Sequence, residues 1–144
     1  MSEITIDPAV TVCFGVEIDG HKLGAFTGCD GLGCEVTVEQ RVEGGNNSFV
    51  HQLPGGLKYT NIKLTRAVNK DTREVADWLA SMATKVERTT ARITAMTADE
   101  TVVMTWSLEG VFPVRWQGPS LRVDSPKVAT ETLELAHHGF RVSV

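Results

Sequence analysis

The side chains in this sequence that could bind a metal ion or act as nucleophiles include three cysteines and four histidines. Cys29 and Cys34 have four residues between them, whereas zinc sites more often use paired C-x-x-C knuckles. His137 and His138 are adjacent, and neighbouring side chains of a strand point to opposite faces, so both could not reach one ion without distortion. The spacing favours no metal or cofactor site, and small buried thiols with strand-end histidines are the simpler interpretation.

Catalysis has equally little support in the sequence. No motif brings cysteine, histidine and aspartate together, and the G-x-S-x-G nucleophile elbow is absent. The acidic pairs Asp99-Glu100 and Glu131/Glu134 fall in predicted turns or strands, where we expect solvated charges. We therefore predict no catalytic residue and no enzyme.

A glycine-rich segment, EGGNNS at residues 43–48, is the remaining candidate ligand site. A phosphate-binding P-loop needs G-x-x-x-x-G-K-[ST] leading into a helix. This segment carries no lysine and leads back into a strand pattern, which argues against phosphate. Phe49, Val50 and Leu53 follow it, so the excursion either contacts another chain or folds back on its own sheet.

The elements around these residues are mostly strands. Alternating patterns predict strands at 11–18, 21–26, 34–42, 57–66, 90–97, 101–108, 111–121 and 128–144. Asp71 is a predicted N-cap, with Glu74 at the capping-box spacing. Val75, Trp78, Leu79 and Met82 then form one apolar stripe of a helix that packs on the sheet. We predict a mainly β, antiparallel β-sandwich or barrel-like domain over residues 1–144, with one flanking α-helix and residues 1–10 as a loose arm.

The strand at residues 34–42 has two different faces. Cys34, Val36, Val38 and Val42 share one face, and Glu35, Thr37, Glu39 and Arg41 share the other. This pattern predicts a strand that is half-buried. The edge strands of such a sheet are templates for pairing with another chain, so self-assembly is a physical expectation.

Composition excludes several classes of protein. The 144 residues carry a formal net charge of −4, which does not suggest a basic nucleic-acid surface. No apolar run approaches the roughly 18 residues of a membrane span, and the first residues lack a signal-peptide pattern. We expect a cytoplasmic chain with reduced thiols that does not insert into a membrane.

An ordered set of motifs from about Phe14 to Gly139 resembles the tail tube proteins of contractile phages and the inner tube proteins of contractile injection systems. The set comprises F-x-V-x-I-x-G at Phe14–Gly20, E-G-G-N-N at Glu43–Asn47, L-P-G at Leu53–Gly55, Y-x-N-I-x-L-x-R at Tyr59–Arg66, P-x-x-W-x-G-P-S-L at Pro113–Leu121 and V-A-x-E-T-L-E-L-A-H-H-G at Val128–Gly139. Ala67 departs from the pattern, since relatives often carry glycine there.

The resemblance implies a structural protein whose subunits form hexameric rings that stack into a hollow tube inside a contractile sheath, with baseplate, spike and cap proteins as further partners. The lumen would carry toxin cargo, or DNA in a phage. Contacts to a neighbouring subunit or ring would come from the residues Glu43, Gly44, Gly45, Asn46, Asn47, Phe49, Leu53, Pro54, Gly55 and Gly56. Residues that could face the lumen are Glu35, Thr37, Glu39 and Arg41.

The leading interpretation is the inner tube of a contractile injection system, assembled in the cytoplasm into a sheathed particle that can be released. The tail tube of a contractile phage virion is the alternative within the same class. A small-ligand-binding β-barrel is the alternative from another class, and it predicts a monomer with a lined pocket.

Overall fold

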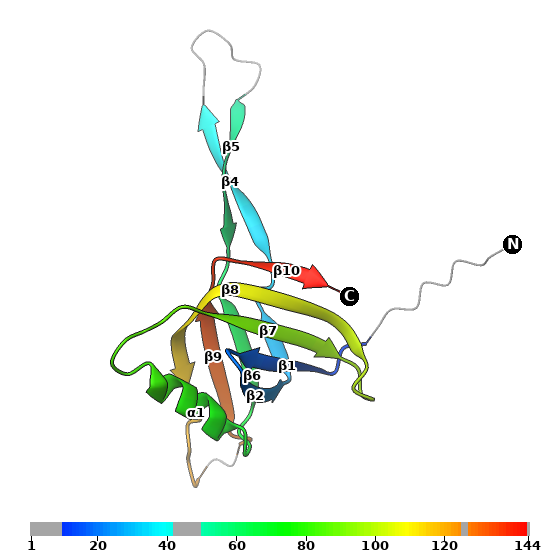
Figure 1. The fold of residues 1–144 in the computed structure, drawn as a ribbon, viewed down its shortest axis with the longest axis vertical. Coiled ribbons are helices and arrows are strands. Elements are labelled where there is room, and N and C mark those ends of the chain that lie inside the picture. The colour runs from blue at the N-terminus through cyan, green and yellow to red at the C-terminus, as the bar shows by residue number, and fades with distance from the viewer. Residues whose placement is uncertain (1–9, 42–49, 125–126, 144) are drawn as a thin grey trace, which may run out of the picture.

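The computed structural model describes residues 10–41, 50–124 and 127–143. They form strands and a single helix, which confirms the mainly β prediction (Figure 1). Eight strands make one antiparallel sheet in the order β2-β1-β7-β8-β9-β6-β3, with β10 also paired to β8. Their bounds are β1 Cys13–Ile18, β2 His21–Phe26, β3 Gly28–Asp30, β6 Ile62–Ala67, β7 Thr89–Met96, β8 Val102–Gln117, β9 Thr130–Ala136 and β10 Gly139–Ser143.

The strands at the two ends of this order, β2 and β3, are one nearly continuous run of chain. β2 pairs with β1 at one end of the sheet, and β3 pairs with β6 at the other. Between them, the backbone N–H of Thr27 donates to the carbonyl of Thr65 at 3.0 Å. The sheet therefore curls until its two ends meet, which gives the barrel-like fold and covers edges that would otherwise be exposed.

β8 runs through both halves of the curled sheet. Its first half pairs with β7 and β10, and its second half pairs with β9. The predicted separate strands at 101–108 and 111–121 are therefore one strand. Gly110, at φ +64°, lets the chain bend here without ending the strand, and a Cβ at this position would lie 2.7 Å from His138 Nδ1. The strand accommodates Pro113 through a register shift between Pro113 and Arg115 in its pairing with β9.

The core fills the inside of the curl with aliphatic side chains. Fully buried residues come from β1, β2, β6, β7, β8 and β9, among them Ile18, Leu23, Ile62, Ile93 and Leu133. Each such side chain contributes roughly 1.5–3 kcal/mol through removal of apolar surface from water. This burial holds the domain together without a disulfide among the described cysteines.

The helix α1 (Thr72–Ser81) covers the core, with Val75 and Trp78 buried. Leu79 and Met82 pack against the same cluster, so the predicted apolar stripe is confirmed. Asp71 occupies the predicted N-cap position, but its backbone is helical and its side chain makes no cap hydrogen bond, so the predicted capping box is wrong. The entry to the helix is held instead by Asn69, whose side-chain carbonyl accepts the Asp71 N–H at 2.8 Å.

A second sheet contains only β4 (Cys34–Arg41) and β5 (His51–Tyr59), which pair with each other. This hairpin projects from one end of the molecule (Figure 1). The predicted strand at 57–66 is wrong as a single element, because Thr60 and Asn61 separate β5 from β6. Residues 51–56, predicted as part of a loop, belong to β5.

Candidate functional site

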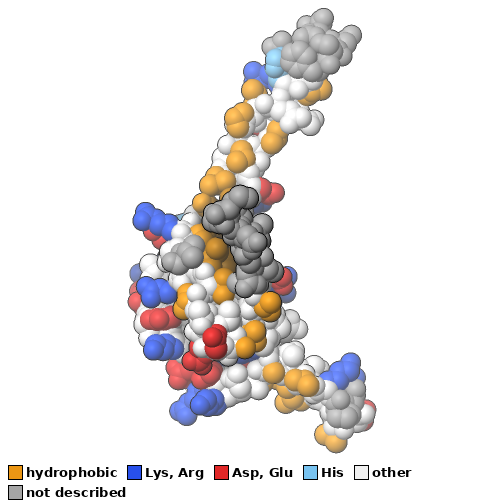
Figure 2. Space-filling model, turned by 90° about the vertical axis from the view of Figure 1, so that its right-hand side faces the viewer, with side chains coloured by type: hydrophobic (Ala, Val, Ile, Leu, Met, Phe, Trp, Pro, Cys, Tyr) orange, Lys and Arg blue, Asp and Glu red, His pale blue; other side chains and the backbone are white. Residues whose placement is uncertain are grey.

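The projecting hairpin has an apolar face on which side chains from both strands meet. Directly opposite residues of an antiparallel pair lie on the same face, and Val36 is opposite Leu57 while Val38 is opposite Pro54. These four residues, called the hairpin stripe below, are all exposed. Val36 is 50% accessible to water, and Val38 and Leu57 are each 55% accessible. Figure 2 shows hydrophobic side chains running along the projection.

The prediction that the strand at 34–42 is half-buried is wrong for the single chain. All eight residues of β4 are exposed. The alternation is present, but β4 and β5 pair only with each other and project beyond the domain, so the apolar face has no core to cover. Val42 lies outside the described residues. An exposed apolar stripe of this kind is typical of a surface that interacts with another molecule.

The opposite face of the hairpin is polar. Glu35 is opposite Lys58, Glu39 is opposite Leu53, and Arg41 is opposite His51. The alternation of β4 also places Thr37 on this face. The structure therefore gathers Glu35, Thr37, Glu39 and Arg41 on one exposed face, together with Leu53 from the predicted contact set.

A β-bulge at Gly55 and Gly56 keeps the two faces in register. Val36 and Val38 are two residues apart, whereas their partners Leu57 and Pro54 are three apart, so both glycines oppose Thr37. Thr37 Oγ1 donates to the Gly56 carbonyl at 3.3 Å. A Cβ on Gly55 would lie 2.2 Å from Thr37 Oγ1 and 3.0 Å from the Thr37 carbonyl oxygen, whereas one on Gly56 would meet open space.

The base of the hairpin is fixed to the domain by a cluster that sequence reasoning missed. Thr60 Oγ1 donates to the Gly31 carbonyl at 3.0 Å. His137 Nε2 lies 2.9 Å from the Thr60 carbonyl, and since a carbonyl only accepts, this nitrogen carries the hydrogen. The Tyr59 ring packs edge-on against Phe140 at 5.3 Å between centroids. These contacts join residues far apart in the chain, so no local pattern could indicate them.

The candidate metal and nucleophile residues are not brought together. The side chain of His137 contacts Thr60, whereas that of His138 lies against Gly110. Burial and the nearby Asp30 raise the pKa of the Cys29 thiol to about 11, so it stays protonated at neutral pH. Cys34 is exposed, so the interpretation of buried thiols is wrong for it. Within residues 10–41, 50–124 and 127–143, no group of three or more His, Cys, Asp and Glu side chains could hold a metal ion.

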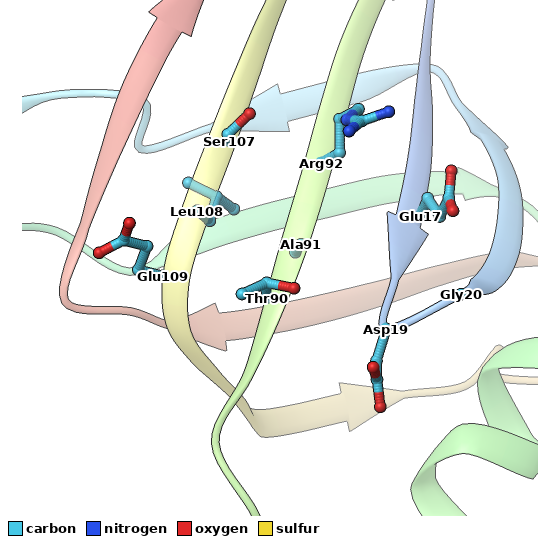
Figure 3. A pocket seen from close by; sticks show the side chains of 9 residues that line it. All are labelled: Glu17, Asp19, Gly20, Thr90, Ala91, Arg92, Ser107, Leu108 and Glu109. Atoms are coloured by element: carbon cyan, nitrogen blue, oxygen red, sulfur yellow. The ribbon is translucent and has the colours of Figure 1, made fainter.

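A groove of about 300 Å³ lies on the outer face of the curled sheet, between the ends of β1, β7 and β8. Figure 3 shows its side chains, including Glu17 on β1 and Arg92 on β7, which are directly opposite in register. The groove is open and lies on the outside of the curled sheet. The inside of the sheet is filled by aliphatic side chains. It gives no support to a ligand enclosed in a barrel.

The remaining predicted contact residues Glu43–Asn47 and Phe49 lie outside the described residues. Pro54 belongs to the hairpin stripe, and Gly55 and Gly56 form the bulge. No helix of the described part of the chain is long and apolar enough to cross a membrane.

Comparison with known families gives one match that spans nearly the whole chain. The family described as "T4-like virus tail tube protein gp19" matches residues 10–141. Among curated proteins, none matches the sequence significantly.

Solved structures of similar fold include chains of an extracellular contractile injection system and of the anti-feeding prophage. A chain in the six-fold symmetrised baseplate of the anti-feeding prophage is 23% identical, with a TM-score of 0.77 over 96% of this chain and 97% of that one. A chain of the PVC sheath–tube complex, from an extracellular contractile injection system in the extended state, is 25% identical, with a TM-score of 0.77 over 94% and 91%. Hcp1 from Flavobacterium johnsoniae shares the fold at 12% identity, with a TM-score of 0.53 over 90% and 94%.

Proposed function

Because this chain belongs to the T4-like virus tail tube protein gp19 family, we propose that six copies form a ring and that the rings stack into the hollow inner tube of a contractile injection system. The six-fold symmetry of the similar baseplate structure supports the number of copies. The tube is a structural conduit and not an enzyme.

The observation that carries this proposal is the two-faced hairpin. A single chain leaves Val36, Val38 and Leu57 about half accessible on an element that contacts no core. Burial of aliphatic surface is favourable by about 25 cal/mol per Å². Packing of the hairpin stripe on a neighbouring copy therefore drives assembly, and the predicted contact residues Pro54, Gly55 and Gly56 lie in or beside that stripe.

The polar face of the hairpin follows from the same arrangement. When the apolar face is buried on a neighbour, Glu35, Thr37, Glu39 and Arg41 remain in water. We assign this face to the lumen, where it contacts passing cargo. The cargo is a protein toxin in an injection system and DNA in a phage.

The partners of the tube are a sheath, a baseplate with its spike, and a cap. This assignment is supported by the similar chains found in baseplate, sheath–tube and cap structures. Assembly takes place in the cytoplasm, and the sheathed particle can then be released from the cell.

The second candidate is the tail tube of a contractile phage virion, and the description of the matching family favours it. Mass spectrometry of sheathed particles purified from the natural host separates the two. Capsid and portal proteins in the same particles identify a virion, and toxin proteins without a capsid identify an injection system.

Electron microscopy of the purified protein tests the proposal directly. We expect rings or tubes of uniform width, and we expect Val38→Asp to leave folded monomers. The matched control is Val86→Asp, since Val86 is 56% accessible, close to the 55% of Val38, but lies outside the hairpin. A natural chain that stays a monodisperse monomer under all assembly conditions would refute the proposed tube.

A further inference from the structure

A second exposed apolar surface lies in the connection between β8 and β9. Leu121, Val123 and Val128, called the connection patch below, are 78%, 103% and 77% accessible to water. They are the three most exposed large hydrophobic side chains of the described residues. The connection begins within the Pro113–Leu121 motif, for which the hairpin provides no role.

The connection patch and the hairpin lie at opposite ends of the molecule. In Figure 1 the hairpin is at the top of the longest axis and the β8–β9 connection is at the bottom. Figure 2 shows hydrophobic side chains on both projections, separated by a body that carries Lys, Arg, Asp and Glu side chains. Neither surface can therefore cover the other within one chain.

The symmetry of a tube decides what covers the hairpin stripe. A stripe that packed on the same stripe of a second copy would form an isologous contact, which closes at a dimer. A ring or a filament needs heterologous contacts, in which one surface meets a different surface of the next copy. Because this chain belongs to a tail tube family, the stripe must meet a different surface.

We propose that the connection patch is the docking surface for the hairpin stripe of a second copy of this chain. This inference rests on the proposed function and names the contact that builds the tube. The two ends then form a head-to-tail joint, in which Val36, Val38, Pro54 and Leu57 of one subunit bury Leu121, Val123 and Val128 of the next. Each subunit offers one free end for the following copy.

Disulfide trapping tests the joint. Val38→Cys and Val123→Cys are introduced together into a Cys34→Ala background, because Cys34 is exposed on the same face of β4, and the protein is assembled and oxidised with copper phenanthroline. We expect a ladder of covalent oligomers on a non-reducing gel. The Cys34→Ala background and each single variant show no ladder, and a mixture of the two single variants adds one dimer that mass spectrometry maps to residues 38 and 123. A second pair, Leu57→Cys with Leu121→Cys, covers the case in which the first pair disturbs packing.

The matched control replaces Val123→Cys with Val102→Cys, at a side chain that is 53% accessible but lies beside the β7–β8 turn. We expect no ladder from Val38→Cys with Val102→Cys. If tubes form but neither test pair gives a ladder, the proposed joint is wrong and the proposed tube still stands. The same holds if the control pair gives a ladder. If the natural chain forms neither rings nor tubes, the proposed function fails and the joint fails with it.

Discussion

Arg66 of β6 and Glu131 of β9 form an ion pair inside the protein, with side chains only 1% and 0% accessible to water. Arg66 Nε donates to Glu131 Oε1 at 3.3 Å, and Nη1 donates to the Leu23 carbonyl at 2.5 Å. The Arg66 guanidinium also stacks 4.1 Å above the centre of the Phe26 ring. The hydroxyl of Thr72 donates to Glu131. The pair therefore ties β2, β6, β9 and the start of α1 together where the curled sheet closes.

Removing one partner of this pair is expected to destabilise the domain strongly. Arg66→Met leaves the Glu131 carboxylate buried without its cation, and such a loss typically costs about 3–5 kcal/mol. Urea unfolding of Arg66→Met, Glu131→Gln and the double variant measures the coupling between them. We expect the double variant to lose much less stability than the sum of the single losses, and simple additivity would contradict the ion-pair interpretation.

The two neighbouring glycines of the bulge should differ in their tolerance of a side chain. Gly55→Ala places a Cβ against the backbone and side chain of Thr37, so the bulge must shift and the stripe loses its register. Gly56→Ala meets open space. We expect Gly55→Ala to reduce tube formation seen by electron microscopy, with little change in thermal unfolding because the hairpin lies outside the core. Gly56→Ala is the control and should assemble, and equal behaviour of both variants would contradict the role of the bulge.

The cysteines should differ in reactivity. The pKa of Cys29 is raised from 9.0 to about 11, mainly by burial and also by Asp30. Because a raised pKa favours the thiol, Cys29 has about a hundredfold less thiolate at pH 8 than a thiol at the ordinary value. Alkylation of the folded chain with iodoacetamide, followed by peptide mass spectrometry, should label the exposed Cys34 first. Faster labelling of Cys29 would mean that its surroundings open in solution.

Local patterns predicted the elements whose partners are near in the chain. The stripe through Val75 and Trp78 predicted a helix on a core, and the alternation of β4 predicted which side chains share a face. Neither pattern could tell whether the apolar face of β4 has a partner in the same chain, since that depends on where the hairpin projects. Glu131 was predicted as a solvated charge and is buried, because its partner Arg66 lies 65 residues away and only the closed sheet brings them together.

The break between β5 and β6 shows in the sequence only as a change in the alternation near Asn61-Ile62, which predicts a bulge within one strand. The pattern over Leu57–Arg66 predicts one strand, but these residues belong to β5 and β6, which lie in different sheets. Gly31, at φ +98°, lies so close to Asn61 that an added Cβ would meet the Asn61 carbonyl oxygen. This close approach between distant residues lies at the base of the hairpin, so the projecting hairpin could not be derived from alternation alone.

The assignment of the polar hairpin face to the lumen predicts that its charges can be reversed without loss of the tube. Glu35 and Glu39 lie opposite Lys58 and Leu53, on the face away from the hairpin stripe. Because this face stays in water in the assembled tube, Glu35→Lys with Glu39→Lys should preserve tube width and length in electron micrographs. The same change raises the lumen charge by four units per subunit, which should increase retention of an acidic fluorescent protein or peptide loaded during assembly and decrease retention of a basic one.

Val36→Lys with Val38→Lys is the matched control on the opposite face of the same strand and should abolish assembly. Loss of tubes on reversal of the glutamates would identify their face as a subunit interface, and unchanged retention of both cargoes would place it outside the lumen.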